Sequence, residues 1–248
     1  MMPSHLRREF SAQVVPSDAN LILITHAMYE HLACAIPILL SAEDPECRIA
    51  CVPEIARSIL STGLVSASKL LVINLGGSVD VGYVTISNVH ANHSVWPELA
   101  TRLARENRTS KSKRSSEVKR PPSKLSGASS SPASSTSGGS MSFAGGASAG
   151  WVIQIANNGP IIYHTGDTNV LNDISMVNQL YRPTHVLLPV GSQCSLTPES
   201  AARVCRENLT SCHTVIPMLF KSAPVDSFTS VLAGSDYEEA QGFDMTLD

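Results

Sequence analysis

The chain has 248 residues, of which 43% are hydrophobic, and its formal net charge at pH 7 is −3. A chain of this length can bury a substantial core within one domain. Because acidic and basic residues almost balance, the molecule as a whole offers no electrostatic basis for nucleic acid or a membrane surface as its main partner. The longest apolar stretch, residues 32–40, is too short to cross a bilayer and is interrupted by Pro37, so no membrane segment is expected.

The start of the chain and its cysteines bear on the cellular compartment. Arg7 and Arg8 are followed by Glu9 and by no apolar run typical of a secretory signal, so a cytoplasmic protein is expected. A mitochondrial transit peptide is the alternative that the two arginines leave open. None of the six cysteines stands in a CxxC pair, which argues against a zinc ribbon or a thioredoxin-like motif. We expect reduced, mostly buried thiols at Cys34, Cys47, Cys51, Cys194, Cys205 and Cys212.

Short apolar runs alternate with helix-start signals along the first hundred residues. The run from Asn20 to Thr25 is rich in branched residues and predicts a buried strand, and Pro53 suits the first turn of a helix. The alternating residues from Val79 to Val89 predict one half-exposed antiparallel strand. In chain order we expect a strand at 20–25, a helix from about 31, a strand at 48–52, a helix at 53–60, a strand at 69–75, a turn at 76–77 and a strand at 79–89. Such alternation of strands and helices is typical of α/β architectures.

The composition changes between residues 102 and 150, where Ser, Gly, Ala, Pro, Lys and Arg dominate. A segment of this kind cannot bury enough apolar surface to offset the entropy of ordering, so we predict a disordered insertion. It divides a single domain into residues 1–101 and residues 151–248, the latter with a flexible tail. A solvated loop is the simplest interpretation, and nucleic acid, acidic partners or kinases are alternatives that its basic cluster suggests. The cluster comprises Arg108, Lys111, Lys113, Arg114, Lys119, Arg120 and Lys124.

Turn and capping signals divide the second half of the chain. A strand at 151–155 leads into Asn157-Asn158-Gly159-Pro160, which together with a strand at 161–163 predicts a hairpin. Thr197 followed by Pro198 predicts the start of a helix, with Thr197 as the N-cap. The remaining predicted elements are a helix at 171–180, a strand at 185–189 and a last strand at 214–217.

Histidines and acidic residues gather in three loops that follow predicted strands. The first loop covers residues 25–31, the second 89–94 and the third 164–168. Binding and catalytic residues are commonly built on such loops. Imidazole nitrogen and carboxylate oxygen are ligands that zinc and similar divalent ions accept, so these side chains are suitable ligands once folding brings them together.

The same segments resemble the metallo-β-lactamase superfamily. Residues 26–31 are similar to its HxHxDH loop, and residues 163–168 to its strand that ends in a His-x-Gly-Asp-Thr turn. Residues 187–191, with 196–202 and 215–218, are similar to a branch of metal-dependent hydrolases near the ascorbate-6-phosphate lactonases. The resemblance covers residues 20–220 apart from the insertion. It implies an α/β (α+β) fold, a four-layer αββα sandwich with the metals at one edge of the sheets.

The resemblance also implies metal ligands, position by position. His26 and His31 match the first and last histidines of the motif, His93 matches the histidine of the next loop, and Asp167 matches the aspartate that bridges two metals. Glu30 stands where the family has aspartate, which keeps the carboxylate on a longer side chain. Zinc is the expected ion, at one per chain, and manganese and iron are alternatives.

Two positions depart from the pattern of the family. Met28 replaces the second histidine of the motif, and a thioether is a poor ligand for a hard or borderline cation. Leu219 stands where the family has its final histidine, and leucine cannot coordinate a metal. Each of the two metal positions therefore lacks one ligand. The ligands that remain are His26, His93 and Asp167 at one position, and Glu30, His31 and Asp167 at the other.

The start of the chain also differs from the family, which opens with several antiparallel strands before its histidine motif. Here His26 comes early. We therefore expect the first sheet to lack strands at one edge, with its apolar surface covered by a partner protein or by a missing exon. A truncated gene model is the alternative.

Two functions follow from this partial match. One ion on His26, His93 and Asp167 would match the open geometry of catalytic zinc, and Glu30 would act as general base in hydrolysis of an ester, lactone or phosphoester of a small molecule. Glu30 and Asp167 are the catalytic candidates of that hypothesis. The other hypothesis is a pseudoenzyme that acts by binding, because apolar residues replace both lost histidines.

Several other side chains are weaker candidates. His90 lies three residues before His93 and is expected on the surface, and His164 is expected to support its loop without touching metal. His185 and His213 have no partner that the sequence reveals. Cys194 as a nucleophile has no motif that would orient a base toward it.

Overall fold

The computed structural model describes residues 17–94, 146–169, 172–191, 196–218, 228 and 238–239, and for residues 29–31, 33, 172 and 238–239 it describes the backbone alone. Apart from its last five residues, the predicted insertion at 102–150 lies outside this part of the chain, as do Cys194 and Leu219. The expected lack of opening strands concerns residues that are also outside it and stays a prediction.

A small parallel sheet forms the first half of the described chain, in the order β1-β2-β3. Two helices follow its first two strands. Helix α3 shows why the sequence forms them: Pro53 occupies the first turn, Glu54 adds an acidic group there, and Ile55, Ala56 and Ile59 form one buried face. The elements are β1 (Leu21–Leu23), α2 (Tyr29–Ser41), β2 (Arg48–Cys51), α3 (Pro53–Ser61), the short 3-10 helix η1 (Ala67–Lys69) and β3 (Leu70–Val72).

A larger mixed sheet follows, with the order β10-β9-β8-β7-β6-β5-β4. Strands β4 to β7 pair antiparallel, and β7 to β10 pair parallel. Its strands are β4 (Ser78–Val81), β5 (Val84–His90), β6 (Ala149–Ile155), β7 (Ile161–His164), β8 (His185–Pro189), β9 (Thr214–Met218) and β10 (Glu238–Glu239). Helices α5 (Asn172–Tyr181) and α6 (Pro198–Asn208) connect its parallel strands.

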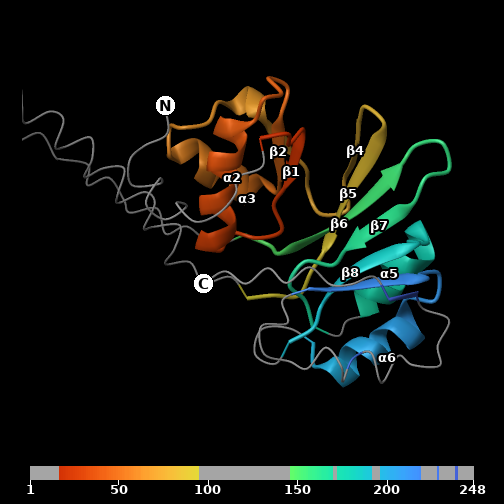
Figure 1. Ribbon diagram of the computed structural model, residues 1–248. Helices are drawn as coiled ribbons and strands as arrows, with labels where there is room; N and C mark the ends of the chain where they lie inside the picture. Colours follow the sequence, from red (N-terminus) through yellow and green to blue (C-terminus); the bar gives the residue numbers. More distant parts are fainter. Residues whose placement is uncertain are drawn as a thin grey trace, which may run out of the picture.

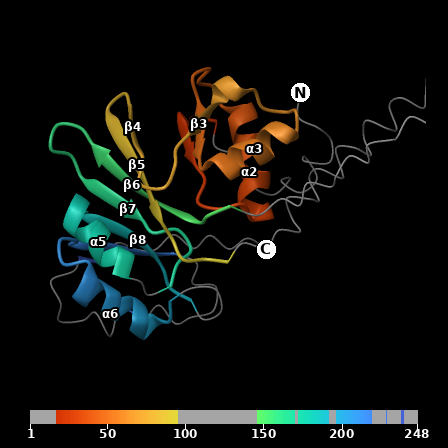
Figure 2. The ribbon, with the colours of Figure 1, turned by 180° about the vertical axis from the view of Figure 1, so that it is seen from behind.

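The buried side chains form three clusters that correspond to the contacts between four layers. One cluster joins α2 and α3 to the small sheet, and another joins α5 and α6 to the large sheet. A third, with Ala50, Ile73, Ile86 and Trp151, contains residues of both sheets and lies between them. Figures 1 and 2 show α2 and α3 on one side of the molecule and α5 and α6 on the other. The predicted αββα arrangement is confirmed.

The prediction of a single strand at 79–89 is wrong, because this segment is a hairpin. Val81 pairs with Val84, which leaves Gly82 and Tyr83 as a two-residue turn. Gly82 has φ +63°, a conformation that glycine adopts without steric cost. Apolar residues change from odd positions (Val79, Val81, Tyr83) to even positions (Val84, Ile86) at this turn, and the prediction overlooked this change.

Other local predictions agree with the structure. Asn157 and Asn158 both have φ +59° in the turn between β6 and β7, and the side chain of Thr197 accepts a hydrogen bond from Ser200 N at the start of α6. Strand β6 begins at Ala149, two residues before the predicted start, because Ala149 and Gly150 pair with the end of β5. Among the described residues, every helix is too short or too polar to traverse a bilayer.

The cysteines that the structure describes are reduced thiols, in agreement with the prediction. Four of them are buried, and Cys34 is half-buried. Burial raises the pKa of Cys51, Cys205 and Cys212 to about 12. These thiols are therefore packing groups and not nucleophiles.

Candidate metal centre

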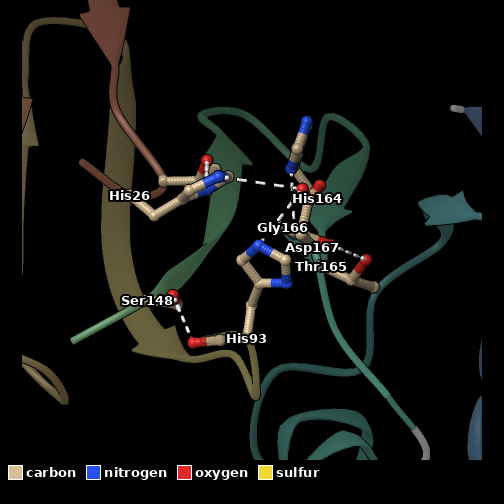
Figure 3. A network of polar contacts seen from close by, with 8 residues as sticks. His26, His93, Ser148, His164, Thr165, Gly166 and Asp167 are labelled. Carbon is tan, nitrogen blue, oxygen red and sulfur yellow. Dashed lines mark hydrogen bonds and ion pairs between the residues drawn. The ribbon is translucent and has the colours of Figure 1, made fainter. Parts of the chain in front are cut away.

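Three loops bring His26, His93 and Asp167 to one place at the edge of the sheets (Figure 3). His26 follows β1, His93 follows β5 and Asp167 follows β7. Strands β5 and β7 both pair antiparallel with β6, so they run in the same direction and end at the same edge of the large sheet. The strand order of the large sheet thus explains why His93 and Asp167, which are far apart in the sequence, lie close together.

One ligand atom from each of the three residues lies within 4.8 Å of the other two. His26 Nε2 is 3.7 Å and His93 Nε2 is 4.0 Å from Asp167 Oδ2, and the two imidazole centroids are 5.0 Å apart. Around a tetrahedral zinc ion with bonds of about 2.0 Å, neighbouring ligand atoms lie about 3.3 Å apart. The two histidine–carboxylate distances exceed this spacing by less than 1 Å, so modest side-chain movements would bring the three ligand atoms around one ion.

Burial favours the same interpretation. The His26 side chain is fully buried, and those of His93 and Asp167 are 13% and 14% exposed. His93 Nε2 is buried and has no hydrogen bond among the described residues. A buried polar atom without a hydrogen bond costs about 1 to 3 kcal/mol, and a bound cation would give this nitrogen a partner. The set of two imidazoles and one carboxylate therefore fits a divalent metal ion.

The loop of His26 is anchored to strand β6. The main-chain oxygen of Thr25 accepts a hydrogen bond from Ala149 N at 2.7 Å, and Trp151 Nε1 donates to Ile24 O at 3.2 Å. Thr25 Oγ1 lies 2.9 Å from His26 Nδ1. This contact engages Nδ1, and Nε2 is the ring atom that faces Asp167. Residues beside a ligand orient metal-binding histidines in this way.

The loop of His93 is held by residues that flank β6 and β7. Ser148 Oγ donates to His93 O at 3.0 Å, and Ala91 N donates to Ser148 O at 3.1 Å. Asn92 N donates to Thr168 Oγ1 at 3.1 Å, which links this loop to the loop of Asp167. The hydrogen bonds fix the backbone on both sides of His93, so its ring enters the site from a rigid support.

The loop of Asp167 depends on a glycine. Gly166 has φ +67°, and a Cβ at this position would lie 2.3 Å from Ala149 O. Gly166 N donates to His164 Nδ1 at 3.0 Å, and Thr165 N donates to Leu187 O at 3.1 Å. His164 thus supports the turn through its ring nitrogen, as the sequence suggested. Only glycine allows this turn to approach β6 closely enough to place Asp167 between the two imidazoles.

The remaining predicted ligands are less well defined. Glu30 and His31 lie in the first turn of α2, and the structure does not describe their side chains. Met28 is the residue before α2 and is half-buried. His90 is exposed, as predicted, and its Nδ1 lies 2.7 Å from Asp173 Oδ2. The assignment of Glu30 and His31 as ligands stays a prediction.

Sequence reasoning missed the residues that support the site. Thr25, Ser148 and Thr168 were not singled out, although Thr25 directly precedes His26 and Thr168 directly follows Asp167. The signal that could have found Thr25 and Thr168 is a hydroxyl residue next to a predicted ligand at the end of a strand. The sequence also gave no partner for His185 or His213, whose rings lie 5.1 Å apart in the structure.

Similarity to known proteins agrees with this arrangement. No protein-family model matches the chain. The chain is 29% identical over 203 residues to a UPF0173 metal-dependent hydrolase of Solibacter usitatus, covering 82% of this chain and 67% of that protein. It is 28% identical over 212 residues to a UPF0173 metal-dependent hydrolase of Methanosarcina mazei, covering 85% and 70%. The chain therefore spans about two thirds of the length of these relatives.

Solved structures show the same fold. Igni18, a metallo hydrolase of Ignicoccus hospitalis, superimposes with a TM-score of 0.61 at 18% identity, over 90% of this chain and 76% of that chain. The metallo-β-lactamase fold protein YhfI of Bacillus subtilis gives 0.56 at 11% identity, over 98% and 84%. The chain has the metallo-β-lactamase fold, and its sequence is similar to those of UPF0173 metal-dependent hydrolases.

Proposed function

We propose that the protein binds one divalent metal ion through His26, His93 and Asp167 and uses it to hydrolyse an ester, lactone or phosphoester of a small molecule. The observation that carries the proposal is the convergence of three ligand atoms within 4.8 Å, at the ends of β1, β5 and β7. The similarity to proteins described as metal-dependent hydrolases supports the reaction type.

The ligand set supports one ion with an open position. Catalytic zinc sites commonly have three protein ligands and leave the fourth position to water or substrate. A bound divalent ion would supply Lewis acidity and lower the pKa of water toward neutrality. Nitrogen and oxygen ligands suit zinc and are also compatible with manganese and iron.

The residues of the chain itself have distinct tasks in this proposal. Asp167 supplies a negative charge between two imidazoles, and Thr25 holds the His26 ring with Nε2 toward that carboxylate. Buried walls around His26 exclude bulk water, which strengthens electrostatic interactions with a substrate. Glu30, four residues after His26, would accept the proton of the attacking water at its carboxylate.

A second candidate is a protein that binds metal or small molecule without turnover. Met28 favours it, because a half-buried thioether stands where the resembling family carries a histidine. This candidate uses the same three ligands. It differs from the hydrolase in one measurable property, which is the rate of hydrolysis by the metal-loaded protein.

The experiment is a hydrolysis screen of chelator-treated protein reloaded with zinc, manganese or iron, using nitrophenyl esters, lactones and phosphodiesters. We expect activity that requires metal and is lost in Asp167→Ala. The matched control is Asp173→Ala, which removes an aspartate that pairs with the exposed His90. Metal binding without hydrolysis of any substrate class would favour the second candidate. Activity that survives Asp167→Ala would contradict the proposed site.

A further inference from the structure

A second pair of histidines lies where two parallel strands of the large sheet begin. His185 is the first residue of β8, and His213 directly precedes β9. The two strands are parallel neighbours, and His185 pairs with Thr214, so the histidines are diagonal neighbours at the two strand starts. Asp167 follows the end of β7, which is parallel to β8. The pair is therefore separate from the candidate metal centre.

The spacing of the two rings suits a shared metal ion. Their centroids are 5.1 Å apart, and the ring planes make an angle of 72°. Two imidazoles that bind one tetrahedral ion through bonds of about 2.0 to 2.1 Å have centroids about 5 Å apart. His26 and His93 have nearly the same spacing, 5.0 Å.

Hydrogen bonds hold the ring of His185 at one of its nitrogen atoms. Thr184 Oγ1 donates to Ile161 O at 3.1 Å and accepts from Ile161 N at 3.0 Å. The same hydroxyl oxygen lies 2.8 Å from His185 Nδ1. This contact engages Nδ1, so Nε2 is the ring atom that would bind a metal.

The environment of the pair favours the neutral form of the His185 ring. Burial, and then the neighbouring His213, lower the pKa of His185 from its ordinary value. Histidine binds metals in its neutral form. The His213 ring is also held at Nδ1, which lies 3.1 Å from Thr214 Oγ1. Each ring is thus oriented by the threonine beside it, before any ion binds.

We propose that His185 and His213 form a second metal site, which binds a borderline divalent transition ion such as zinc through the two imidazoles, with water at the remaining positions. The ion would clip the start of β8 to the start of β9. Imidazole pairs suit zinc, nickel and copper, and they do not suit magnesium or calcium. This site does not depend on the proposed hydrolase function.

The test is zinc titration of tag-free protein by calorimetry at pH 7.5, before and after His213→Asn. His213 is exposed, so its replacement leaves the core intact. We expect this change to lower the number of bound zinc ions by one, whereas the control His90→Asn leaves the number unchanged. His185→Asn should have the same effect as His213→Asn.

The same titration in a His26→Ala and Asp167→Ala background separates the two sites. One equivalent of zinc should remain in that background and disappear when His213→Asn is added. An unchanged stoichiometry after His213→Asn, in the wild type or in this background, would overturn the proposal. Because His26 is fully buried, the wild-type comparison decides the question if the double variant does not fold.

Discussion

Replacement of Gly166 by alanine should damage both the stability of the fold and the metal centre. Gly166 has φ +67°, and a Cβ would lie 2.3 Å from Ala149 O, far inside contact distance. A left-handed conformation costs a non-glycine residue about 1 to 2 kcal/mol. Overpacking of the backbone against a new methyl group adds about 1 to 3 kcal/mol. The sum predicts a loss of about 2 to 5 kcal/mol in the free energy of unfolding.

A matched control separates these two effects. Gly82 has a similar φ of +63°, and a Cβ there meets nothing within 4 Å. Gly82→Ala should therefore cost only the conformational part, about 1 to 2 kcal/mol. Urea denaturation of the two variants measures the difference. Because Gly166 positions Asp167, zinc affinity should fall about 10- to 100-fold in Gly166→Ala and stay unchanged in Gly82→Ala. Equal effects of the two substitutions on stability and affinity would refute the argument.

Three further predictions concern the support of the site, its lost ligand and the buried thiols. Thr168→Val removes the acceptor of Asn92 N and should lower the free energy of unfolding by about 1 to 3 kcal/mol in urea denaturation; an unchanged value would contradict the link between the two loops. Met28→His restores an imidazole beside His26 and should tighten zinc binding in calorimetry, and unchanged affinity would show that position 28 does not face the ion. Three buried thiols have a pKa of about 12 in the folded chain and about 9 in the unfolded chain. Between pH 9 and 12 the folded chain therefore keeps protons that the unfolded chain releases. Stability should therefore decrease as pH rises above 9, and native protein at pH 8 should resist iodoacetamide at these positions in mass spectrometry; rapid labelling would contradict their burial. The thiols are Cys51, Cys205 and Cys212.

The sequence predicted elements well where local chemistry marks their limits. Strand β8 has the predicted bounds, and the hairpin at Asn157 and Asn158 forms as expected because both residues tolerate a positive φ. The prediction failed at Gly82 and Tyr83, where the alternation changes phase between two short strands. Such a change over two residues is easily mistaken for an irregularity within one strand, because both halves keep a period of two.

The meeting of three candidate ligands was predictable from the sequence, and the residues that support them were not. His26, His93 and Asp167 follow from motif resemblance, since the motif fixes both residue type and order. The hydrogen bond from Asn92 to Thr168 joins residues 76 positions apart and depends on the strand order of the large sheet. The same holds for His185 and His213, which meet only because β8 and β9 are neighbours.

Metal content by elemental analysis tests the central claim most directly. Tag-free protein is loaded with zinc and freed of excess metal, and the wild type is compared with Asp167→Ala and Asp173→Ala. If His26, His93 and Asp167 hold one ion, Asp167→Ala will contain one zinc ion per chain fewer than the wild type, and Asp173→Ala will contain the same number. Equal zinc content in the wild type and Asp167→Ala would contradict the assignment of the metal centre.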